Sequence, residues 1–374
     1  MINSSFYSFV YYKRNLISTS ISRVINMQEF LVGGAIRDKI LGVATEKTEK
    51  DYVVVGSSPE EMKSLGFRQV GKEFPVFLHP QTNEEYALAR LERKVSKGYK
   101  GFEFDTSKSV TLEQDLSRRD LTINAIAQSK NGSGEYIDPF GGLNDLKQKK
   151  LRHVSEAFTE DPVRILRTAR LASRFNHLGF TIDPKTLDLM KIMVDSGEVD
   201  VLTPERVFKE IYLSMNTESP SIFFEVLIES GAYQRLFPML EMNQNIEFQL
   251  LDQPDLIGEV KFALWLYQQK SSSIQSLCDH LKCPKDIQQI AELVSIWQGF
   301  SSDFLSHEPQ EILSFFLKTD GLRRQRRFEI ILNAFENLKI DTSPIVQLKI
   351  QLNSIKITDL KNLNIAQELA EERL

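Results

Sequence analysis

Short apolar runs bounded by polar residues fill the N-terminal part of the chain, and helical spacing dominates the rest. Tyr52–Val55 is an apolar run of strand length, and Glu85–Leu91 alternates apolar and polar residues as a half-buried strand does. We also expect a short helix at Pro59–Leu65 and strand material at Arg68–Leu78. From Glu241 onward the periodicity is helical, with breaks near prolines. The pattern predicts strands mixed with helices first and helices alone towards the end.

A Gly-Gly pair stands near the start of the stretch Leu31–Gly56, directly after a short apolar entry. Glycines lack Cβ atoms, so Gly34 and its neighbour let a ligand approach the backbone closely. Arg37 follows in the next turn. The stretch is not a Walker loop, because no Gly-Lys-Ser/Thr follows, and the dinucleotide fingerprint needs a third glycine. A tight turn without a ligand is the simpler interpretation of the glycines alone.

Glu49 and Asp51 lie at the mouth of the apolar strand that follows this turn. Residues two apart on a strand point to the same face. Two adjacent carboxylates repel each other unless a cation lies between them, and a hard divalent ion such as Mg²⁺ suits a pair of oxygen ligands. With the glycines and Arg37, the pair predicts a triphosphate bridged to a metal. A solvated acidic surface is the alternative.

The second informative stretch is Asp115–Ala127, DLSRRDLTINAIA. Arg118, Arg119 and Asp120 precede an apolar run that we interpret as helical, and four-residue spacing would place Asp120 and Asn124 on one face. Adjacent arginines usually point apart, so we expect only one of them to meet a ligand. A planar guanidinium suits bidentate contact with phosphate, which favours a phosphate-binding role for that arginine.

A third stretch, Glu160–Arg174, reads EDPVRILRTARLASR and predicts a helix with a proline in its first turn. A charged stripe runs beside its apolar face and repeats every three residues, at Asp161, Arg164, Arg167 and Arg170. Such a stripe is often a solvated surface. Three arginines without interleaved glutamates, led by one aspartate, also fit a binding role.

Two further basic segments have open interpretations. The stretch Glu92–Phe104, ERKVSKGYKGFEF, is either a mobile surface loop or a basic flap that closes over phosphate or an RNA end. The cluster Leu322–Phe328, LRRQRRF, is either a surface helix turn or a contact for tRNA backbone.

These motifs occur in the order GGAIRD, paired carboxylates, RRDLTINA, DPFGG, EDPVRILRTAR and LTPERVFKE. In this order they resemble the tRNA nucleotidyltransferases called CCA-adding enzymes, of the bacterial and eukaryotic class within the polymerase β-like nucleotidyltransferase superfamily. The resemblance extends from about Phe30 to Pro238. It implies an α+β fold, in which a head with a small, five-stranded mixed sheet precedes a helical neck, body and tail.

We expect these parts to divide the chain as follows: an N-terminal extension at 1–26, the head at 27–140, the neck at 141–212, the body at 213–300, and a tail that contacts tRNA at 301–374. The resemblance implies an enzyme that adds C, C and A to the tRNA 3′ end from CTP and ATP and releases pyrophosphate. It also implies Mg²⁺ as cofactor.

The resemblance places three groups of residues in the site. It implies metal binding by Glu49 and Asp51, contacts to triphosphate or ribose from Gly34, Arg37 and Arg119, and base recognition by Asp161, Arg164, Arg167 and Arg170.

One departure from the family pattern concerns the metal pair, which is usually Asp-x-Asp. Here Glu49 takes the first position, after a connection about two residues longer, and its extra methylene shifts the carboxylate relative to the near-ideal octahedron that Mg²⁺ demands. Activity could be reduced or lost. A catalytically impaired tRNA-binding relative is therefore one alternative, and a poly(A) polymerase, which uses the same chemistry, is the other.

Composition adds limits on partners and compartment. The net charge of −5 argues against indiscriminate binding to polyanions but allows a local basic groove. Two cysteines cannot form a disulfide scaffold, so we expect a reducing compartment, the cytoplasm. Residues 1–26 have a composition that resembles an organelle transit peptide, but we favour a disordered tail or a true start at Met27. They contain no membrane segment, and the oligomeric state is left open.

Overall fold

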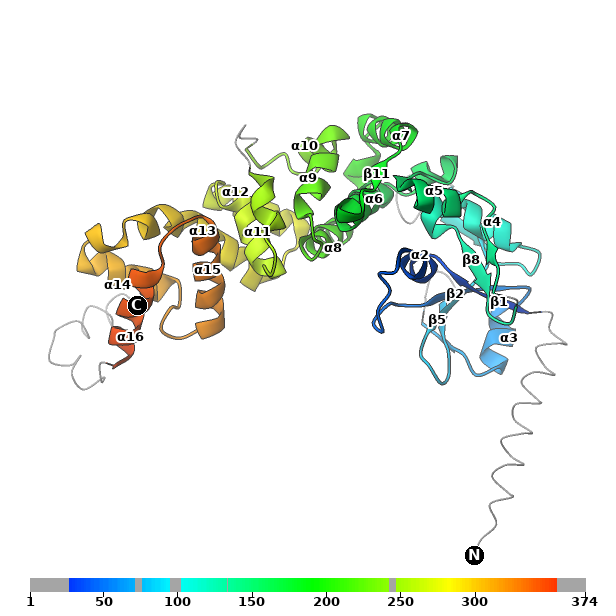
Figure 1. The fold of residues 1–374 in the computed structure, drawn as a ribbon, viewed down its shortest axis with the longest axis horizontal. Helices are drawn as coiled ribbons and strands as arrows, with labels where there is room; N and C mark the ends of the chain where they lie inside the picture. The colour runs from blue at the N-terminus through cyan, green and yellow to red at the C-terminus, as the bar shows by residue number, and fades with distance from the viewer. Residues whose placement is uncertain (1–26, 71–75, 95–101, 133, 242–246, 355–374) are drawn as a thin grey trace, which may run out of the picture. The chain divides into compact units, whose positions relative to one another are not determined.

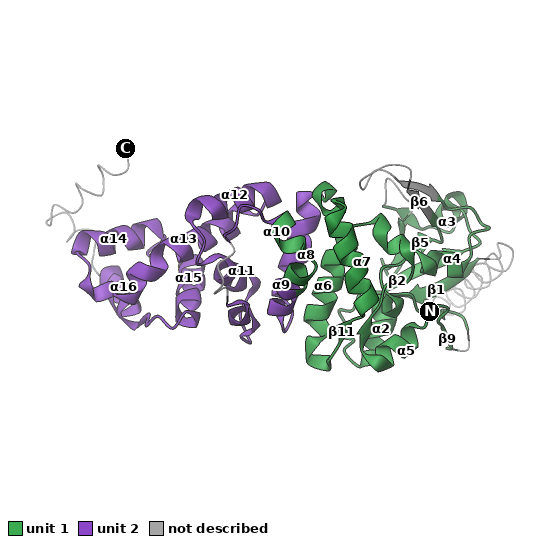
Figure 2. Ribbon diagram, turned by 90° about the horizontal axis from the view of Figure 1, so that it is seen from above, with its two compact units in different colours: residues 1–202, 226–235 green, residues 203–225, 236–374 purple. Residues whose placement is uncertain are grey.

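A computed structural model describes the chain over residues 27–70, 76–94, 102–132, 134–241 and 247–354. The chain forms two compact units (Figure 2), of which the first comprises residues 1–202 and 226–235 and the second comprises residues 203–225 and 236–374. All described strands lie in the first unit, and the described part of the second unit is helical. The expected order of a mixed α/β part followed by a helical part is confirmed.

The largest sheet of the first unit is mixed and has seven strands, in the order β3-β4-β5-β2-β1-β8-β9. Its central strand β2 runs antiparallel to β1 and parallel to β5 (Figure 1). The strands are β1 (Gln28–Val32), β2 (Asp51–Val55), β3 (Arg68–Gln69), β4 (Val76–Leu78), β5 (Glu85–Leu88), β8 (Ala127–Ser129) and β9 (Tyr136–Ile137). The sheet exceeds the five strands expected because two-residue strands, β3 and β9, extend both of its edges.

Side chains of β2 alternate between two hydrophobic clusters, one on each face of the sheet. Tyr52 and Val54 belong to one cluster, and Val53 belongs to the other, together with Leu116 of helix α4 (Leu112–Ser117). Because side chains alternate along a strand, Asp51 points to the same face as Val53. The first residue of β2 therefore faces the side of the sheet that α4 covers.

The run 121–127 after Asp120 is not the helix that its apolar residues suggested. It forms a short 3₁₀ turn, η1 (Thr122–Asn124), and then enters β8. The amide of Thr122 donates to the carbonyl of Arg152 (2.9 Å), a residue distant in sequence, instead of to the preceding helical turn. Burial from several sides, rather than an amphipathic helix, explains the apolar residues of this run.

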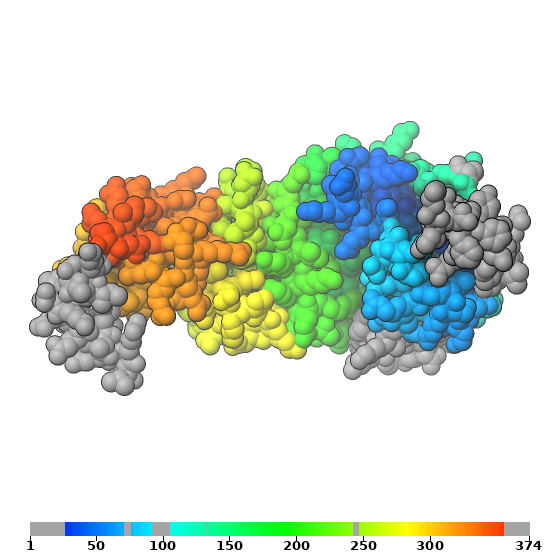
Figure 3. Space-filling model, turned by 90° about the horizontal axis from the view of Figure 1, so that it is seen from below, coloured from blue at the N-terminus to red at the C-terminus, as the bar shows by residue number. Residues whose placement is uncertain are grey.

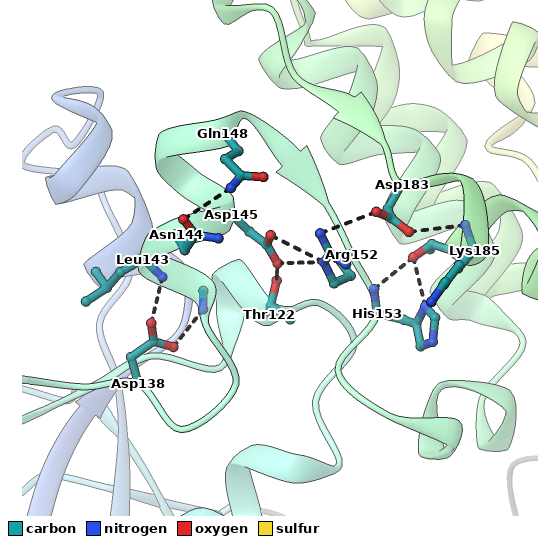
Figure 4. Close-up of polar contacts among 12 residues, drawn as sticks. Thr122, Asp138, Leu143, Asn144, Asp145, Gln148, Arg152, His153, Asp183 and Lys185 are labelled. Carbon is teal, nitrogen blue, oxygen red and sulfur yellow. Dashed lines mark hydrogen bonds and ion pairs between the residues drawn. The ribbon is translucent and has the colours of Figure 1, made fainter.

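Three further helices and a two-stranded parallel sheet complete the described core of the first unit. They are α5 (Gly142–Gln148), β10 (Lys150–Leu151), α6 (Val163–Phe175), β11 (Thr181–Ile182) and α7 (Pro184–Asp195). Figure 4 shows polar contacts that involve η1, α5, the residues after β10 and the start of α7. Thr122 Oγ1 donates to Asp145 Oδ2 (2.7 Å), and Arg152 bridges Asp145 (3.1 Å) and Asp183 (3.4 Å). These contacts fix η1 against α5.

The predicted short helix after β2 is confirmed as α3 (Pro59–Ser64), and a capping box at Ser58 and Glu61 begins it. The predicted basic flap starts in β6 (Leu91–Lys94) and ends in β7 (Phe102–Asp105), which pair as an antiparallel hairpin. Residues 95–101 between them lie outside the described residues, so the function of the flap stays a prediction.

The second unit is a stack of helices whose apolar faces meet in an aromatic core. Its helices include α8 (Pro204–Met215), α11 (Gly258–Leu266), α12 (Ser271–Leu281), α13 (Lys285–Ser302), α14 (Pro309–Lys318), α15 (Gln325–Asn337) and α16 (Ser343–Ser354). Both cysteines, Cys278 and Cys283, are free and buried there. Among the described helices, none combines the length and the apolar character needed to cross a bilayer.

Gly142 packs against η1 so closely that any side chain would clash. A Cβ at this position would lie 2.2 Å from the carbonyl oxygen of Thr122. We therefore expect Gly142→Ala to lower the free energy of unfolding by about 3 kcal/mol, measured by chemical denaturation. Gly299→Ala on α13, where nothing lies within 4 Å, is the control and should change little or stabilise by up to about 1 kcal/mol. Equal losses in the two variants would contradict this close contact.

Candidate active site

The sheet brings the predicted carboxylate pair next to the predicted glycine turn. Asp51 begins β2 and pairs with Val32, the last residue of β1, which directly precedes Gly33. Asp51 and Glu49 are both exposed. Glu49 belongs to the connection from α2 (Gly34–Leu41) to β2, which is part of the blue surface in Figure 3.

Four charged side chains influence one another around Asp51. Asp51 is exposed, but neighbouring atoms partly desolvate its carboxyl group, and this desolvation raises the pKa of Asp51. Arg119 lowers the pKa, Glu49 raises it, and Arg167 lowers it. A cation between the two carboxylates would relieve their repulsion, and the positive charges of Arg119 and Arg167 also favour the ionised form of Asp51.

The carboxylate pair fits a metal that takes its remaining ligands from elsewhere. Glu85 of β5 is the register partner of Asp51, yet within the described residues no three carboxylate, histidine or cysteine side chains converge on one metal position. Mg²⁺ is commonly held by one or two carboxylates and completes its octahedron with water and substrate phosphates. An exposed pair beside a glycine turn suits that mode of binding.

Gly33 allows Arg119 to lie against the glycine turn. Gly33 has a φ of 73°, in the left-handed region that favours glycine. A Cβ at this position would lie 3.1 Å from Nη1 of Arg119, which is closer than an ordinary contact. Gly34 follows as the first residue of α2, and a Cβ there would meet Nη2 of Arg37 at 3.4 Å. Both glycines therefore make room for an arginine of this site.

The adjacent arginines Arg118 and Arg119 share one carboxylate, so the expectation that they point apart is wrong. Nη2 of Arg118 lies 2.8 Å from Oδ1 of Asp115, and Nη2 of Arg119 lies 3.3 Å from Oδ2. Burial alone would raise the pKa of Asp115, but the two arginines and the amide of Arg90 hold it below its usual range. Asp115 on α4 thus fixes the position of Arg119 next to the glycine turn.

Arg37, which we expected to contact the triphosphate, is only 5% exposed. Its Nε donates to Oδ1 of Asp38 (2.8 Å), and its Nη1 donates to Oδ1 of Asn124 (2.5 Å). The guanidinium lies over the ring of Phe175, 5.0 Å from its centroid. Burial lowers the pKa of Arg37, and Asp38 opposes that shift. These contacts give Arg37 a structural role beneath the turn, and a direct contact with phosphate stays a prediction.

Asp120 joins helix α6 to η1. Its Oδ2 lies 2.8 Å from Nη2 of Arg167, and its Oδ1 accepts from Nδ2 of Asn124 (2.9 Å). Burial alone would raise the pKa of Asp120, but Arg167, the Asn124 amide and Arg164 together hold it far below its usual range. Asp120 and Asn124 contact each other through this hydrogen bond in a turn, and not on one face of the helix that we expected.

These contacts continue into a closed circuit that begins and ends on α6. Arg174, in the last turn of that helix, places Nη2 2.8 Å from Oδ2 of Asp38. We call the circuit the arginine–aspartate ring; its members in order are Arg167, Asp120, Asn124, Arg37, Asp38 and Arg174. The ring fastens two points of α6, seven residues apart, to the part of the molecule that carries the glycine turn.

Asp161 lies two residues before α6, not on it as expected. Its Oδ1 accepts a hydrogen bond from the amide of Val163 (3.2 Å). Arg164, in the first turn of α6, is 7% exposed and donates to the carbonyl oxygens of Ala157 (2.7 Å) and Arg118 (2.6 Å). The guanidinium plane of Arg164 is thus fixed by two backbone groups, next to the segment that carries Arg118.

Sequence reasoning missed Asp115 and Arg174, although each had a detectable signal. Asp115 stands three and four residues before the adjacent arginines, and Arg174 stands two helical turns after Arg167. Both spacings place side chains on one face of a helix. The three-residue stripe that we weighed instead includes Arg170, which is half-buried, and its contact with substrate stays a prediction.

Comparison with protein families gives two matches along the chain. Residues 29–152 match the family described as the poly A polymerase head domain. Residues 179–243 match the family described as a probable RNA and SrmB-binding site of polymerase A. The first match contains the whole seven-stranded sheet apart from the first residue of β1.

Curated relatives match nearly the whole chain. A CCA-adding enzyme of Coxiella burnetii is 46% identical over 358 residues, which cover 94% of this chain and 92% of the relative. A multifunctional CCA protein of Teredinibacter turnerae is 42% identical over 340 residues, which cover 81% of this chain and 82% of the relative.

Solved structures share the fold at lower identity. A tRNA nucleotidyltransferase complexed with a primer tRNA and an incoming ATP analogue matches with a TM-score of 0.66 and 23% identity, over 89% of this chain and 99% of that one. The Thermotoga maritima CCA-adding enzyme complexed with tRNA matches with a TM-score of 0.64 and 21% identity, over 91% of this chain and 83% of that one.

The lowered pKa of Asp120 makes the stability of the protein depend on pH in acid. The unfolded carboxyl takes up a proton near pH 4, whereas the folded one stays ionised, so the stabilisation is complete above that pH and is lost as the pH falls towards the folded pKa. Below pH 4 we expect the free energy of unfolding to fall by about 1.4 kcal/mol per pH unit more steeply for the wild type than for Asp120→Asn.

Guanidinium denaturation between pH 5 and pH 3 measures these slopes. Asp188→Asn, at an exposed aspartate of α7, is the matched control for the change from Asp to Asn. Identical slopes for the wild type and Asp120→Asn would show that the carboxylate is not stabilised by its arginine partners.

Proposed function

The chain belongs to the family of CCA-adding enzymes, and from this premise we propose how its own residues carry out nucleotide transfer to tRNA. The enzyme is a nucleotidyltransferase that adds C, C and A in turn to the 3′ end of tRNA, from CTP and ATP, with release of pyrophosphate. The observation that carries the proposal is the position of Asp51, next to the glycine turn and within electrostatic reach of Arg119.

Glu49 and Asp51 hold a divalent metal in this proposal, and we take it to be Mg²⁺. When bound there, the metal would supply activation of the tRNA 3′-hydroxyl and neutralisation of charge on the leaving pyrophosphate. Arg119, anchored by Asp115 through a terminal nitrogen, orients the triphosphate over the turn at Gly34. Arg37 supports that turn from below, through its contacts with Asp38 and Asn124.

The reaction uses no nucleic-acid template, so the protein itself must select the base. We propose that Asp161, just before α6, and Arg164, in its first turn, make this selection. Cytosine and adenine each present an amino donor beside a ring-nitrogen acceptor, whereas uracil and guanine present a carbonyl acceptor beside an N–H donor. Asp161 accepts hydrogen bonds and Arg164 donates them, so together they match the first pair and oppose the second. Arg167 steadies this end of the helix through Asp120, and Arg170 is proposed to hold phosphate.

The remaining assignments concern tRNA and compartment. We propose the division into head, neck, body and tail given above, with the tail at 301–374 in contact with tRNA. The basic cluster Leu322–Phe328 at the start of α15 would supply positive charge for the RNA backbone. The protein is proposed to work in the cytoplasm.

One assay tests the proposed function against its alternatives. A tRNA without its CCA end is incubated with CTP and ATP, first separately and then together. We expect the defined sequence CCA only when both nucleotides are present. A long A tract from ATP alone would identify a poly(A) polymerase, and no incorporation, with tRNA still bound, would identify an impaired relative in which Glu49 fails as a metal ligand.

Removal of the proposed metal ligand Asp51 should stop nucleotide transfer without releasing tRNA. Asp51→Ala is expected to abolish transfer and to leave tRNA affinity nearly intact, because affinity comes mainly from contacts with the RNA backbone elsewhere. Gel-based incorporation and filter binding measure the two quantities. Glu49→Asp separates two cases: activity is kept or raised if the connection is not matched to the longer side chain, and falls if it is. Substantial transfer by Asp51→Ala would refute the metal site.

Loss of the base-selecting carboxylate should change selectivity, and loss of the phosphate-binding arginine should not. A site built around hydrogen bonds leaves its own groups unpaired with the wrong base, at a cost of roughly 1–3 kcal/mol per group. Asp161→Ala should therefore lower the use of CTP and ATP and narrow their advantage over UTP and GTP. Arg119→Ala should weaken all four nucleotides alike. Values of kcat/KM for each nucleotide test this, and unchanged selectivity in Asp161→Ala and Arg164→Ala would exclude templating.

A further inference from the structure

Arg174 lies in the last turn of α6, far from Arg164, which selects the base in the proposed function. It stands ten residues after Arg164, which corresponds to about 15 Å along the axis of a helix. A residue at that distance does not contact the same base. Its described partners are Asp38, at 2.8 Å, and the ring of Phe175, whose centroid lies 5.0 Å from Cζ of Arg174.

The partner of Arg174 is itself buried and shared. Asp38 is 4% exposed, and each of its carboxylate oxygens accepts from one arginine: Oδ1 from Arg37 and Oδ2 from Arg174. Without Arg174, a buried carboxylate oxygen loses its charged partner. A buried carboxylate that loses a partner is costly, so Asp38 and the guanidinium bound to it are expected to shift.

A shift of Arg37 reaches the active site in two steps. Nη1 of Arg37 holds the side chain of Asn124 (2.5 Å), and the backbone carbonyl of Asn124 lies 3.5 Å from Nη1 of Arg119. The same Asn124 side chain holds Asp120, which holds Arg167 on α6. Arg119 and the base-selecting end of α6 are therefore both connected to Arg174 through the arginine–aspartate ring.

We propose that Arg174 is a positioning residue for nucleotide transfer, which acts through Asp38, Arg37 and Asn124 on the placement of Arg119 and without contact to nucleotide or tRNA. The inference rests on the proposed function of Arg119. Arg174 suits this test better than Asp38, because its side chain is 37% exposed and its removal leaves no buried charge of its own. Removal of Asp38 would leave the guanidinium of Arg37 buried without its carboxylate.

The experiment compares the full chain with Arg174→Ala and Arg174→Lys in two reactions: CMP addition to tRNA that lacks CCA, and AMP addition to tRNA that ends in CC. We expect Arg174→Ala to lower kcat in both reactions by roughly tenfold to a hundredfold, because small displacements of catalytic groups have effects of that size. KM for tRNA should stay unchanged, and Arg174→Lys should recover part of kcat. Arg68→Ala, at an exposed arginine of β3 in the same unit, is the matched control and should behave as the wild type.

A double-variant comparison tests the path. Because Asn124 lies between Arg174 and Arg119, Arg174→Ala should lower kcat much less in an Asn124→Ala background than alone. Additive losses would overturn the path through Asn124.

Two results for Arg174→Ala would overturn the proposal. An increase in KM for tRNA with unchanged kcat would show a direct phosphate contact. A lower melting temperature, with kcat unchanged at temperatures well below the melting temperature, would show a purely structural ion pair. A wild type that adds neither nucleotide would refute the proposed function itself, and with it this inference.

Discussion

A buried guanidinium is the constraint on which the first unit depends. Arg37 is charged, and a charge without partners is not tolerated away from water. Its three nitrogens are satisfied by Asp38 and Asn124. Arg174 of α6 holds Asp38, and Asp120 holds Asn124. Asp120 compensates the charge of Arg167, Asp38 is shared by Arg37 and Arg174, and the uncharged amide of Asn124 joins these two ionic groups. The glycine turn rests on this ring.

The turn that carries Asn124 is also held by close packing and hydrogen bonds from α5. Gly142 brings α5 against the carbonyl of Thr122, and Asp145 accepts the hydroxyl of the same residue. The segment between Arg119 and β8 is therefore fixed both by the arginine–aspartate ring and by α5. Rigid support of this kind is what a site needs if it orients a flexible triphosphate with few direct contacts.

The sequence allowed prediction of the elements and of the chemistry near the surface. Asp51 begins a strand, as its place before four apolar residues indicated, and the short helix expected at Pro59–Leu65 is present as α3. The direction in which Arg37 points could not be predicted, because its partner Asn124 is 87 residues away. Likewise the carboxylate of Asp38 meets Arg174 across 136 residues. Local periodicity describes only neighbours within a few residues, so it misassigned the enclosed run after Asp120 as a helix.

The two contacts of α6 with the arginine–aspartate ring fix the number of residues between Arg167 and Arg174. Arg167 and Arg174 are separated by seven residues, close to two full turns, so both face the same side. One inserted or deleted residue between them would rotate the second arginine by about 100° and carry it away from Asp38. We therefore expect length variation in this family to be absent between these two positions.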